Sequence, residues 1–422
     1  MYGRQAPTTL GSNTPRTPIA PPPGVYESNF GLLAADPSWR NSWMTIVAGK
    51  FSSSPYSGLL FVEQLTGYAE LYDTNGQGQI HAPYRRSFSP LGDRATWTHV
   101  IPGLFGPSGF TGLLLYDQAA GFGRFYDGDG QGGFVLRSEY SGWRTSWTHI
   151  VAGRFVATSP YSSVFFYSAS ENYGEIWETD GKGLVGTAPY QTFSNFWSST
   201  FTHVLAADFH WTPWYITSTP TLTDLCFYDA VAGHGEMYRC DVQTPGDPNS
   251  PSNIVLTVAA TSDTLPRQAT CVVAGNFGGL GDSDLAFYDG PGGTLSFYAF
   301  DDIDNDSANI ILREIQSGLR TTTNLVISGN FWMSNPEDHW FNDGHPRPLH
   351  RRIILTGDSV LAGFLISCST TETPDWVNSI FTNPLLHRAN LSRDTLPRQV
   401  RITARLRYQQ EAYLPESRSL FT

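Results

Sequence analysis

The stretch from Thr148 to Phe155 reads THIVAGRF, and versions of this apolar run recur along the chain. The other versions are MTIVAGKF from Met44, THVIPGLF from Thr98, THVLAADF from Thr202, TCVVAGNF from Thr270 and NLVISGNF from Asn324. The positions immediately before the six versions are 43, 97, 147, 201, 269 and 323, which gives intervals of 50 to 68 residues. Recurrence at such intervals predicts a repeat architecture.

Each unit continues in the same order after this opening run. An apolar stretch that ends in aromatics follows, such as LLLYD from Leu113, and a Gly-containing turn leads to a third stretch such as GFGRFYD from Gly121. Asp-Gly turn signals such as DGDGQGG from Asp127 precede a weaker fourth stretch. Four short antiparallel strands per repeat are typical of a β-propeller blade. The 41 Gly, 28 Pro and 14% aromatic residues, against 15% charged residues, also favour an all-β chain.

The two ends of the chain carry incomplete units. Residues 29–43, NFGLLAADPSWRNSW, match residues 133–147, GFVLRSEYSGWRTSW, so we expect the chain to begin with the last strand of a blade. The phrase DTLPRQ precedes the fifth opening run and recurs at Asp394, so we expect the chain to end by starting a blade. We therefore predict six complete blades and a composite seventh, closed by the N- and C-termini from residues 24–42 and 400–422. Six blades with a capping strand are the alternative.

The repeats also predict the domain organisation. Residues 1–23, which include PTTLGSNTPRTPIAPPP, are Pro-rich and are expected to form a flexible arm. Residues 24–422 are expected to form a single β-propeller domain. Its repeats start near residues 43, 97, 147, 201, 269, 323 and 400.

One unit carries a family resemblance. The stretch AGNFGGLGDSDLAFYD from Ala274 resembles the FG-GAP or VCBS-type repeat of integrin α-chain propellers and propeller lectins. That resemblance implies a calcium site in the loop, but only Asp282 and Asp284 remain here, and calcium needs six or more oxygens. We therefore expect no cofactor, with a weak calcium site at these two residues as the alternative. Asp127 and Asp129 suit a hairpin turn better than a metal site.

Three histidines occupy one equivalent position near the start of an opening run, His99, His149 and His203. Facing positions in a propeller are too far apart for one metal ion, so we interpret them as hydrogen-bonded structural residues. The sixth unit carries an insertion, residues 332–352, with several His and Asp residues but no known metal-binding spacing. A long loop on a rigid scaffold is a candidate for specificity.

Charge and cysteine content bear on the partners and the compartment. A formal charge of −12 argues against a nucleic-acid partner, because phosphate binding needs clustered Lys and Arg. No apolar run is long enough to span a membrane and no secretory signal is evident, so we expect a cytoplasmic protein or one exported by a non-standard route. Cys226 and Cys240 flank a predicted hairpin, and free thiols or a disulfide both remain open.

The connection between the last strand of one blade and the first strand of the next, which we call the seam, repeats Trp and Arg. An exposed aromatic ring beside a guanidinium and a carboxylate can stack against a sugar and bond its hydroxyls. The alternative is that these rings only wedge neighbouring sheets apart. The candidate ligand-binding residues are Trp39, Arg40, Trp43, Arg94, Trp97, Asp117, Trp143, Arg144, Trp147 and Trp197.

The sequence contains no nucleophile elbow, phosphate-binding loop, HExxH motif or nucleotide fingerprint, and the opening runs offer no carboxylate pair. The function predicted from the sequence is therefore a non-enzymatic, multivalent, lectin-like propeller that binds glycans, with a glycoside hydrolase or lyase as a minority hypothesis. The runner-up is a protein-interaction or structural subunit that docks a protein partner through the Pro-rich arm and the 332–352 loop.

Overall fold

A computed structural model describes a large part of the chain. The chain divides into two compact units, Met1–Ser369 and Thr370–Thr422, and every described residue lies in the first. The described residues are 26–27, 40, 42–43, 45–63, 65–75, 80, 83–183, 185–209, 222–242, 254–275, 277, 283–301, 308–319, 321, 323–329, 352–357 and 364–366. The Pro-rich arm, the 332–352 loop and residues 400–422 therefore lie outside them.

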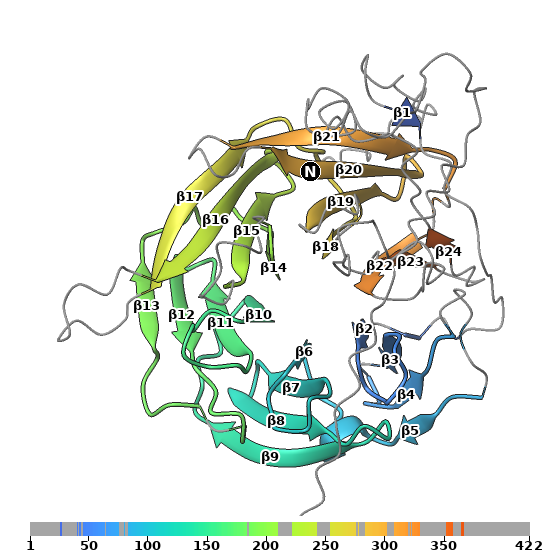
Figure 1. Ribbon diagram of the computed structural model, residues 1–422, viewed down its shortest axis with the longest axis vertical. Coiled ribbons are helices and arrows are strands. Elements are labelled where there is room, and N and C mark those ends of the chain that lie inside the picture. The colour runs from blue at the N-terminus through green and yellow to red at the C-terminus, as the bar shows by residue number, and fades with distance from the viewer. Residues whose placement is uncertain are drawn as a thin grey trace, which may run out of the picture. The chain divides into compact units, whose positions relative to one another are not determined.

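The first three blades are separate four-stranded antiparallel sheets whose strands pair in chain order (Figure 1). The first comprises β2 (Thr45–Gly49), β3 (Gly58–Val62), β4 (Ala69–Tyr72) and β5 (Arg86–Phe88). The second comprises β6 (His99–Gly103), β7 (Gly112–Asp117), β8 (Phe122–Gly128) and β9 (Phe134–Ser141), and η1 (Leu91–Asp93) precedes it. The third comprises β10 (His149–Gly153), β11 (Ser163–Ser168), β12 (Tyr173–Trp177) and β13 (Gln191–Ser194).

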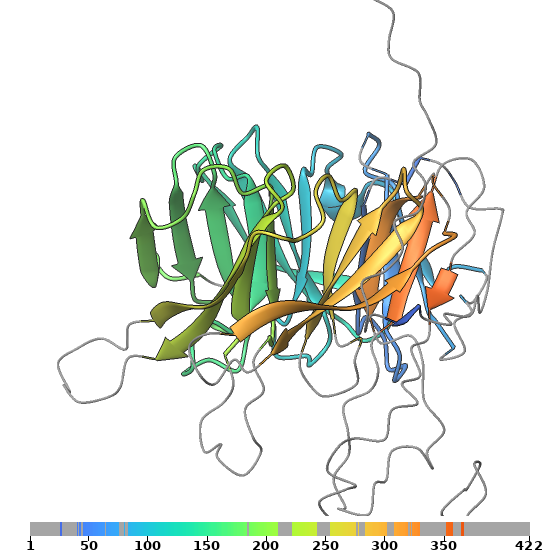
Figure 2. The same ribbon diagram turned by 90° about the horizontal axis from the view of Figure 1, so that it is seen from above.

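The fourth and fifth blades join through their outer strands. The fourth comprises β14 (His203–Ala207), β15 (Asp224–Asp229), β16 (His234–Val242) and β17 (Ile254–Ser262). The fifth comprises β18 (Cys271–Gly275), β19 (Asp284–Asp289), β20 (Thr294–Asp301) and β21 (Ala308–Gln316). Strands β17 and β21 pair in parallel, and the short β1 (Tyr26–Glu27) pairs in parallel with β21. Figure 2 shows the long outer strands, olive to orange, lying aslant the upright green strands of the third blade.

Among the described residues, six inner strands contact one another in turn and close into a ring (Figure 1). They are β2, β6, β10, β14, β18 and β22. The sixth blade comprises β22 (Thr323–Gly329), β23 (Arg352–Gly357) and β24 (Phe364–Ile366), and β22 contacts β2 directly. Ile327 of β22 packs into the core of the first blade beside Trp43 and Phe61. The described chain is thus an all-β propeller, as predicted, but its inner strands number six rather than seven.

The observed number of inner strands differs from the predicted number because a repeat match identifies a strand but not the sheet with which that strand pairs. The N-terminal residues were assigned to a composite blade because residues 29–43 match a last strand. In the structure, Tyr26 pairs with Glu314 and Glu27 with Ile315 on β21 of the fifth blade, and β22 meets β2 without a further inner strand between them. The C-terminal part of the predicted composite blade lies outside the described residues.

Large aromatic side chains of the second strands form the core between blades, as predicted. They are all buried, namely Phe61, Tyr116, Phe166, Phe227, Tyr228, Phe287 and Tyr288. The tyrosine at the end of the second strand also holds the following seam, because its hydroxyl donates to a seam carbonyl. Tyr167 donates to Ser198 over 2.8 Å, and Tyr116 and Tyr228 donate to Arg144 and Pro266. The second, third and fourth blades are thereby fastened to the chain segment that enters the next blade.

Glycines on the third strands make room for the seam side chains. A Cβ built on Gly123 would lie 2.5 Å from the Trp143 ring, and one on Gly174 would lie 2.8 Å from the Trp197 ring. In the fourth blade the neighbour of Gly235 is Leu265, at 2.4 Å from such a Cβ. The recurring Gly of the third strand is therefore required by packing at the blade boundary.

The histidines link neighbouring inner strands. His149 Nε2 lies 2.9 Å from the carbonyl oxygen of Thr202, and its Nδ1 lies 2.9 Å from the hydroxyl of Thr148. The backbone of Thr148 in turn bonds His99, so the contact is repeated from blade to blade. Burial lowers the pKa of all three imidazoles, that of His203 to about 4. The structural interpretation of the histidines agrees with these contacts.

The cysteines Cys226, Cys240 and Cys271 are free thiols, so the possible disulfide between Cys226 and Cys240 is not present. Their positions explain this, because Cys226 pairs with Met237 across β15 and β16 rather than with Cys240. Burial raises the pKa of the Cys226 thiol to about 12. Both thiols of the predicted hairpin are therefore inert core side chains.

Gly123→Ala should lower the stability of the propeller by about 1–3 kcal/mol, because the added methyl group overlaps the Trp143 ring. The midpoint of urea-induced unfolding measures this effect. Adding Trp143→Phe should recover part of the loss, since the smaller ring withdraws from the new methyl group. A Gly123→Ala protein that unfolds at the wild-type midpoint would contradict this account of the boundary.

His203→Gln should flatten the loss of stability on acidification. In the unfolded chain the imidazole takes up a proton near its ordinary pKa, whereas in the folded chain it resists until about pH 4. Its contribution is therefore complete above pH 7 and falls by about 2–3 kcal/mol as the pH drops toward 4. Glutamine does not titrate, so the urea midpoints at pH 7 and pH 4.5 should differ less in the variant. An unchanged difference would show that His203 is not a buried neutral imidazole.

Candidate functional site

The seam tryptophans are buried in the structure. Their exposed fractions are 8% for Trp43, 2% for Trp97, 3% for Trp147 and 3% for Trp197. Trp143 is half-buried and stacks on Tyr140, with ring centroids 5.4 Å apart, and Trp39 lies outside the described residues. The four buried rings cannot lie against a sugar, so the predicted stacking role does not apply to them and they wedge the blades instead.

A second aromatic ring, which comes from the start of the third strand, stacks on each seam ring. Trp43 stacks on Tyr68 at 6.1 Å, Trp97 on Phe122 at 6.0 Å and Trp147 on Tyr173 at 6.0 Å between centroids. In the fourth blade Phe201 stacks on His234 at 6.0 Å. The interplanar angles, 17°, 20°, 17° and 21°, show the same arrangement four times.

A seam arginine covers the third-strand ring in the first three blades. Arg40 lies 4.8 Å from the Tyr68 centroid, Arg94 lies 4.8 Å from Phe122 and Arg144 lies 4.4 Å from Tyr173. The arginine side chains are 53%, 36% and 48% exposed in the same order. Each guanidinium therefore lies against aromatic surface on one side while part of it remains open to solvent.

In the first and third blades a buried glutamate holds this arrangement together. Glu70 accepts hydrogen bonds from the hydroxyls of Tyr68 and Tyr72, over 2.7 and 2.6 Å, and from Arg40 over 3.2 Å. Burial, followed by the bond to Glu70, raises the pKa of Tyr72, so this phenol stays a neutral donor. We call each such combination of seam arginine, third-strand ring and carboxylate an arginine cluster.

The arginine cluster of the third blade repeats this pattern. Glu175 accepts from the Tyr173 hydroxyl over 2.8 Å and from the Trp177 indole N–H over 2.7 Å. Arg144 lies 3.9 Å from Glu175 and bonds a second carboxylate, Glu171, over 3.0 Å. One cation here bridges two carboxylates while it rests on an aromatic ring.

The second blade replaces the glutamate by Arg124, and the carboxylate of its cluster comes from Asp117. Asp117 is buried and lies 3.2 Å from Arg94, and it also accepts from the hydroxyl of Thr96. Arg124 donates to the carbonyl of Gly92 over 2.7 Å and to Glu139 over 3.2 Å. The structure therefore brings Asp117 and Arg94 together, as the candidate set implied.

Sequence reasoning missed the third-strand residues. Glu70 and Tyr72 of β4 alternate with Tyr68, which immediately precedes the strand, as Tyr173, Glu175 and Trp177 alternate along β12. Alternate residues of a strand share one face, so an aromatic-x-Glu-x-aromatic pattern places one carboxylate between two donors. The third-strand phrases GYAELYD and YGEIW carried this signal.

Two of the carboxylates considered for calcium, Asp129 and Asp284, bind backbone N–H groups, whereas Asp127 binds the side chains of Ser108 and Arg137. Asp129 accepts from the N–H groups of Gln131 and Gly133, both over 2.7 Å, which is the predicted turn role. Asp284 accepts from the N–H of Phe277 over 2.9 Å, and Asp282 lies outside the described residues. Within the described ranges no group of three or more His, Cys, Asp or Glu residues is placed to hold a metal ion.

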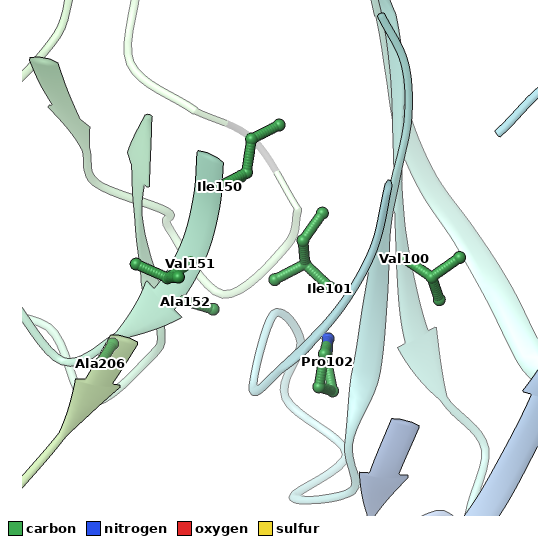
Figure 3. A pocket seen from close by; sticks show the side chains of 7 residues that line it. All are labelled: Val100, Ile101, Pro102, Ile150, Val151, Ala152 and Ala206. Atoms are coloured by element: carbon green, nitrogen blue, oxygen red, sulfur yellow. The ribbon is translucent and has the colours of Figure 1, made fainter. Parts of the chain in front are cut away.

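The inner strands also border a cavity of about 220 Å³. Figure 3 shows its lining from β6, β10 and β14, and every side chain in it is apolar. They are Val100, Ile101, Pro102, Ile150, Val151, Ala152 and Ala206. The polar chemistry of the described residues thus lies at the seams and blade ends rather than at this cavity.

Comparison of the sequence with known families and with curated proteins gives no match. Among solved structures, a protein from Lactobacillus plantarum is similar over 63% of this chain and 69% of its own, with 9% identity and a TM-score of 0.37. Sqt1 from Saccharomyces cerevisiae is similar over 82% of this chain and 99% of its own, with 10% identity and a TM-score of 0.37. Neither likeness carries a functional argument. In the part of the chain that is described, no helix has the length and apolarity of a membrane span.

Glu175→Ala should destabilise the third blade more than Arg144→Ala. Removing the glutamate leaves the Tyr173 hydroxyl and the Trp177 N–H without their acceptor, which costs about 2–3 kcal/mol. Removing the half-exposed arginine should cost less than about 1 kcal/mol, because its ion pairs are screened by water. Urea midpoints of the two variants test the order, and a larger loss for Arg144→Ala would assign the arginine to the scaffold.

Proposed function

We propose that this protein is a non-enzymatic, multivalent, lectin-like propeller whose arginine clusters contact neutral glycans. The observation that carries the proposal is the threefold recurrence of a half-exposed guanidinium, fixed on an aromatic ring beside a carboxylate, at Arg40, Arg94 and Arg144. Structural wedging accounts for the tryptophans, but it does not require an exposed arginine at each seam.

The chemistry of the clusters suits vicinal hydroxyl groups. A guanidinium offers several N–H donors in a fixed plane, so it can donate to two neighbouring hydroxyl oxygens of a diol, while the buried carboxylates Glu70, Asp117 and Glu175 hold it in place. The aromatic ring beneath Arg144 restrains the guanidinium, which reduces the entropy lost on binding. Each arginine is already paired with at least one carboxylate, so the clusters favour a neutral polyhydroxyl ligand over a phosphate.

Repetition supports the multivalent part of the proposal. A single cluster exposes few groups and should bind one sugar weakly. Three clusters on one chain can engage several branches of a glycan or neighbouring glycans on a surface, and the effective concentration then raises the overall affinity without new contacts. We further propose that the repeats are degenerate members of the FG-GAP or VCBS type, which the phrase AGNFGGLGDSDLAFYD supports.

A protein-interaction role is the second candidate. Apolar side chains are exposed on the outer strands, at Val135 and Leu136 of β9 and at Val255 and Val258 of β17. Such side chains on sheet surfaces favour a protein partner. The Pro-rich arm and the 332–352 loop were the expected docking elements, and they stay a prediction because they lie outside the described residues.

Isothermal titration of the full chain at pH 9.0 tests the first candidate. The probes are the methyl glycosides of glucose, galactose, mannose, fucose and N-acetylglucosamine, after a glycan array has ranked them. We expect three equivalents of the best glycoside per chain. Arg144→Ala should remove one equivalent by weakening that cluster at least tenfold, because a hydrogen bond from a charged group contributes about 1.5–3 kcal/mol.

Arg86→Ala is the matched control. Arg86 also lies over an aromatic ring, that of Phe88, beside a carboxylate, Asp129, and is 50% exposed, but it belongs to an outer strand rather than a seam. This variant should keep all three equivalents. An array without binding, together with recovery of a defined protein partner, would overturn the glycan proposal in favour of the second candidate.

A further inference from the structure

The fourth blade keeps the stacked arrangement but changes its cation. His234 stands at the start of β16, where the first three blades have Tyr68, Phe122 and Tyr173, and it stacks on Phe201 of the seam. The seam residue three positions before Phe201 is Ser198, whereas Arg40, Arg94 and Arg144 stand three positions before their tryptophans. The fourth seam therefore supplies no guanidinium from that position.

The imidazole of His234 lies between two carboxylates. Its Nε2 is 3.0 Å from Glu236 and its Nδ1 is 2.7 Å from Asp263. A carboxylate only accepts hydrogen bonds, and a neutral imidazole has one N–H, so both contacts are satisfied only when both ring nitrogens carry protons. The geometry thus selects the imidazolium.

The imidazolium occupies the chemical role that an arginine has in the third blade. Arg144 rests on an aromatic ring and joins Glu171 to Glu175, and His234 rests on Phe201 and joins Asp263 to Glu236. Glu236 also accepts from the hydroxyl of Tyr238, as Glu175 accepts from the Trp177 N–H. The fourth blade thus also joins two carboxylates through one cation, but this cation is titratable and stands where the third blade has Tyr173.

We propose that His234, Glu236 and Asp263 form a fourth sugar-binding cluster that is competent only while His234 is protonated. This inference rests on the proposed function, because it assigns the same ligand class to the fourth blade. The imidazolium holds the two carboxylates in place as acceptors for the hydroxyls of a neutral sugar. Loss of its proton removes one of the two hydrogen bonds and leaves the carboxylates without a shared cation.

The groups that face His234 raise its pKa above the ordinary value for histidine. Burial alone would lower the pKa of His234, but the bonds to Glu236 on its own strand and to Asp263 outweigh burial and raise it. Asp229, at the end of β15, also interacts with His234. Arg267, from the seam after β17, lies near Gly233, the residue before His234. The protonated form is therefore present at pH 6.0 and is lost as the pH rises.

Titration of the full chain with the best-ranked methyl glycoside at pH 6.0 and pH 9.0 tests the inference. Wild type should bind four equivalents at pH 6.0 and three at pH 9.0. His234→Phe keeps a ring on Phe201, as Phe122 does on Trp97, and should bind three at both values. Arg144→Ala should lose one equivalent at both values, because an arginine stays charged throughout.

A conservative variant keeps the test independent of folding. Asp263→Asn changes an exposed side chain, and it should move the midpoint of the pH-dependent equivalent to lower pH because one anionic acceptor is lost. Three equivalents at both pH values in wild type would overturn this inference and leave the proposed function standing. Absence of glycoside binding at both values would overturn both, and a pH-dependent equivalent that survives in His234→Phe would assign the effect elsewhere.

Discussion

The hydrogen bond from a second-strand tyrosine to the following seam is the contact that positions the arginine cluster of the third blade. Tyr116 donates to the carbonyl of Arg144, and Tyr167 donates to that of Ser198, the residue at the same place in the next seam. The backbone of one residue is thus held by the preceding blade while its side chain lies over the following blade. Because both tyrosines are fully buried, the bond is shielded from water and fixes where the seam enters. The placement of the Arg144 guanidinium over Tyr173, which stacks on Trp147, follows from it.

The clusters separate two tasks that a functional site must perform. Buried rings and the glutamates, such as Trp147 and Glu175, satisfy one another and make the blade boundary rigid. The arginine adds little to this scaffold and keeps much of its surface in water. A side chain held in plane by a ring and a carboxylate loses less freedom on binding than a free arginine would. The site therefore costs the fold little, which explains how it can be present at several seams.

The sequence predicted what depends on local pattern. The repeat period, the strand order, the turn residues and the buried second-strand aromatics could all be predicted, because each follows from the spacing within one repeat. The burial of Trp43, Trp97, Trp147 and Trp197 could not be predicted from the sequence. The seam sequence around a tryptophan does not show whether its ring faces solvent or packs against side chains of the third strand. Among the described residues the inner strands number six rather than the expected seven for a related reason, since the contact of β22 with β2 joins segments far apart in the chain. The sequence of a repeat does not show which distant strand will lie beside it.

The side chains around the stacked rings differ from blade to blade, while the distance and angle between the rings stay nearly the same. Four stacked pairs share nearly one distance and angle, yet the groups around them change from glutamate to Arg124 in the second blade and from arginine to Ser198 in the fourth. Each cluster draws its side chains from one blade and its flanking seams, so a substitution there alters one cluster without disturbing the packing of the others. A repeat propeller can therefore hold clusters of different charge on one scaffold. His234 fits this logic, because it restores a cation where the seam arginine is missing and makes that cation dependent on pH.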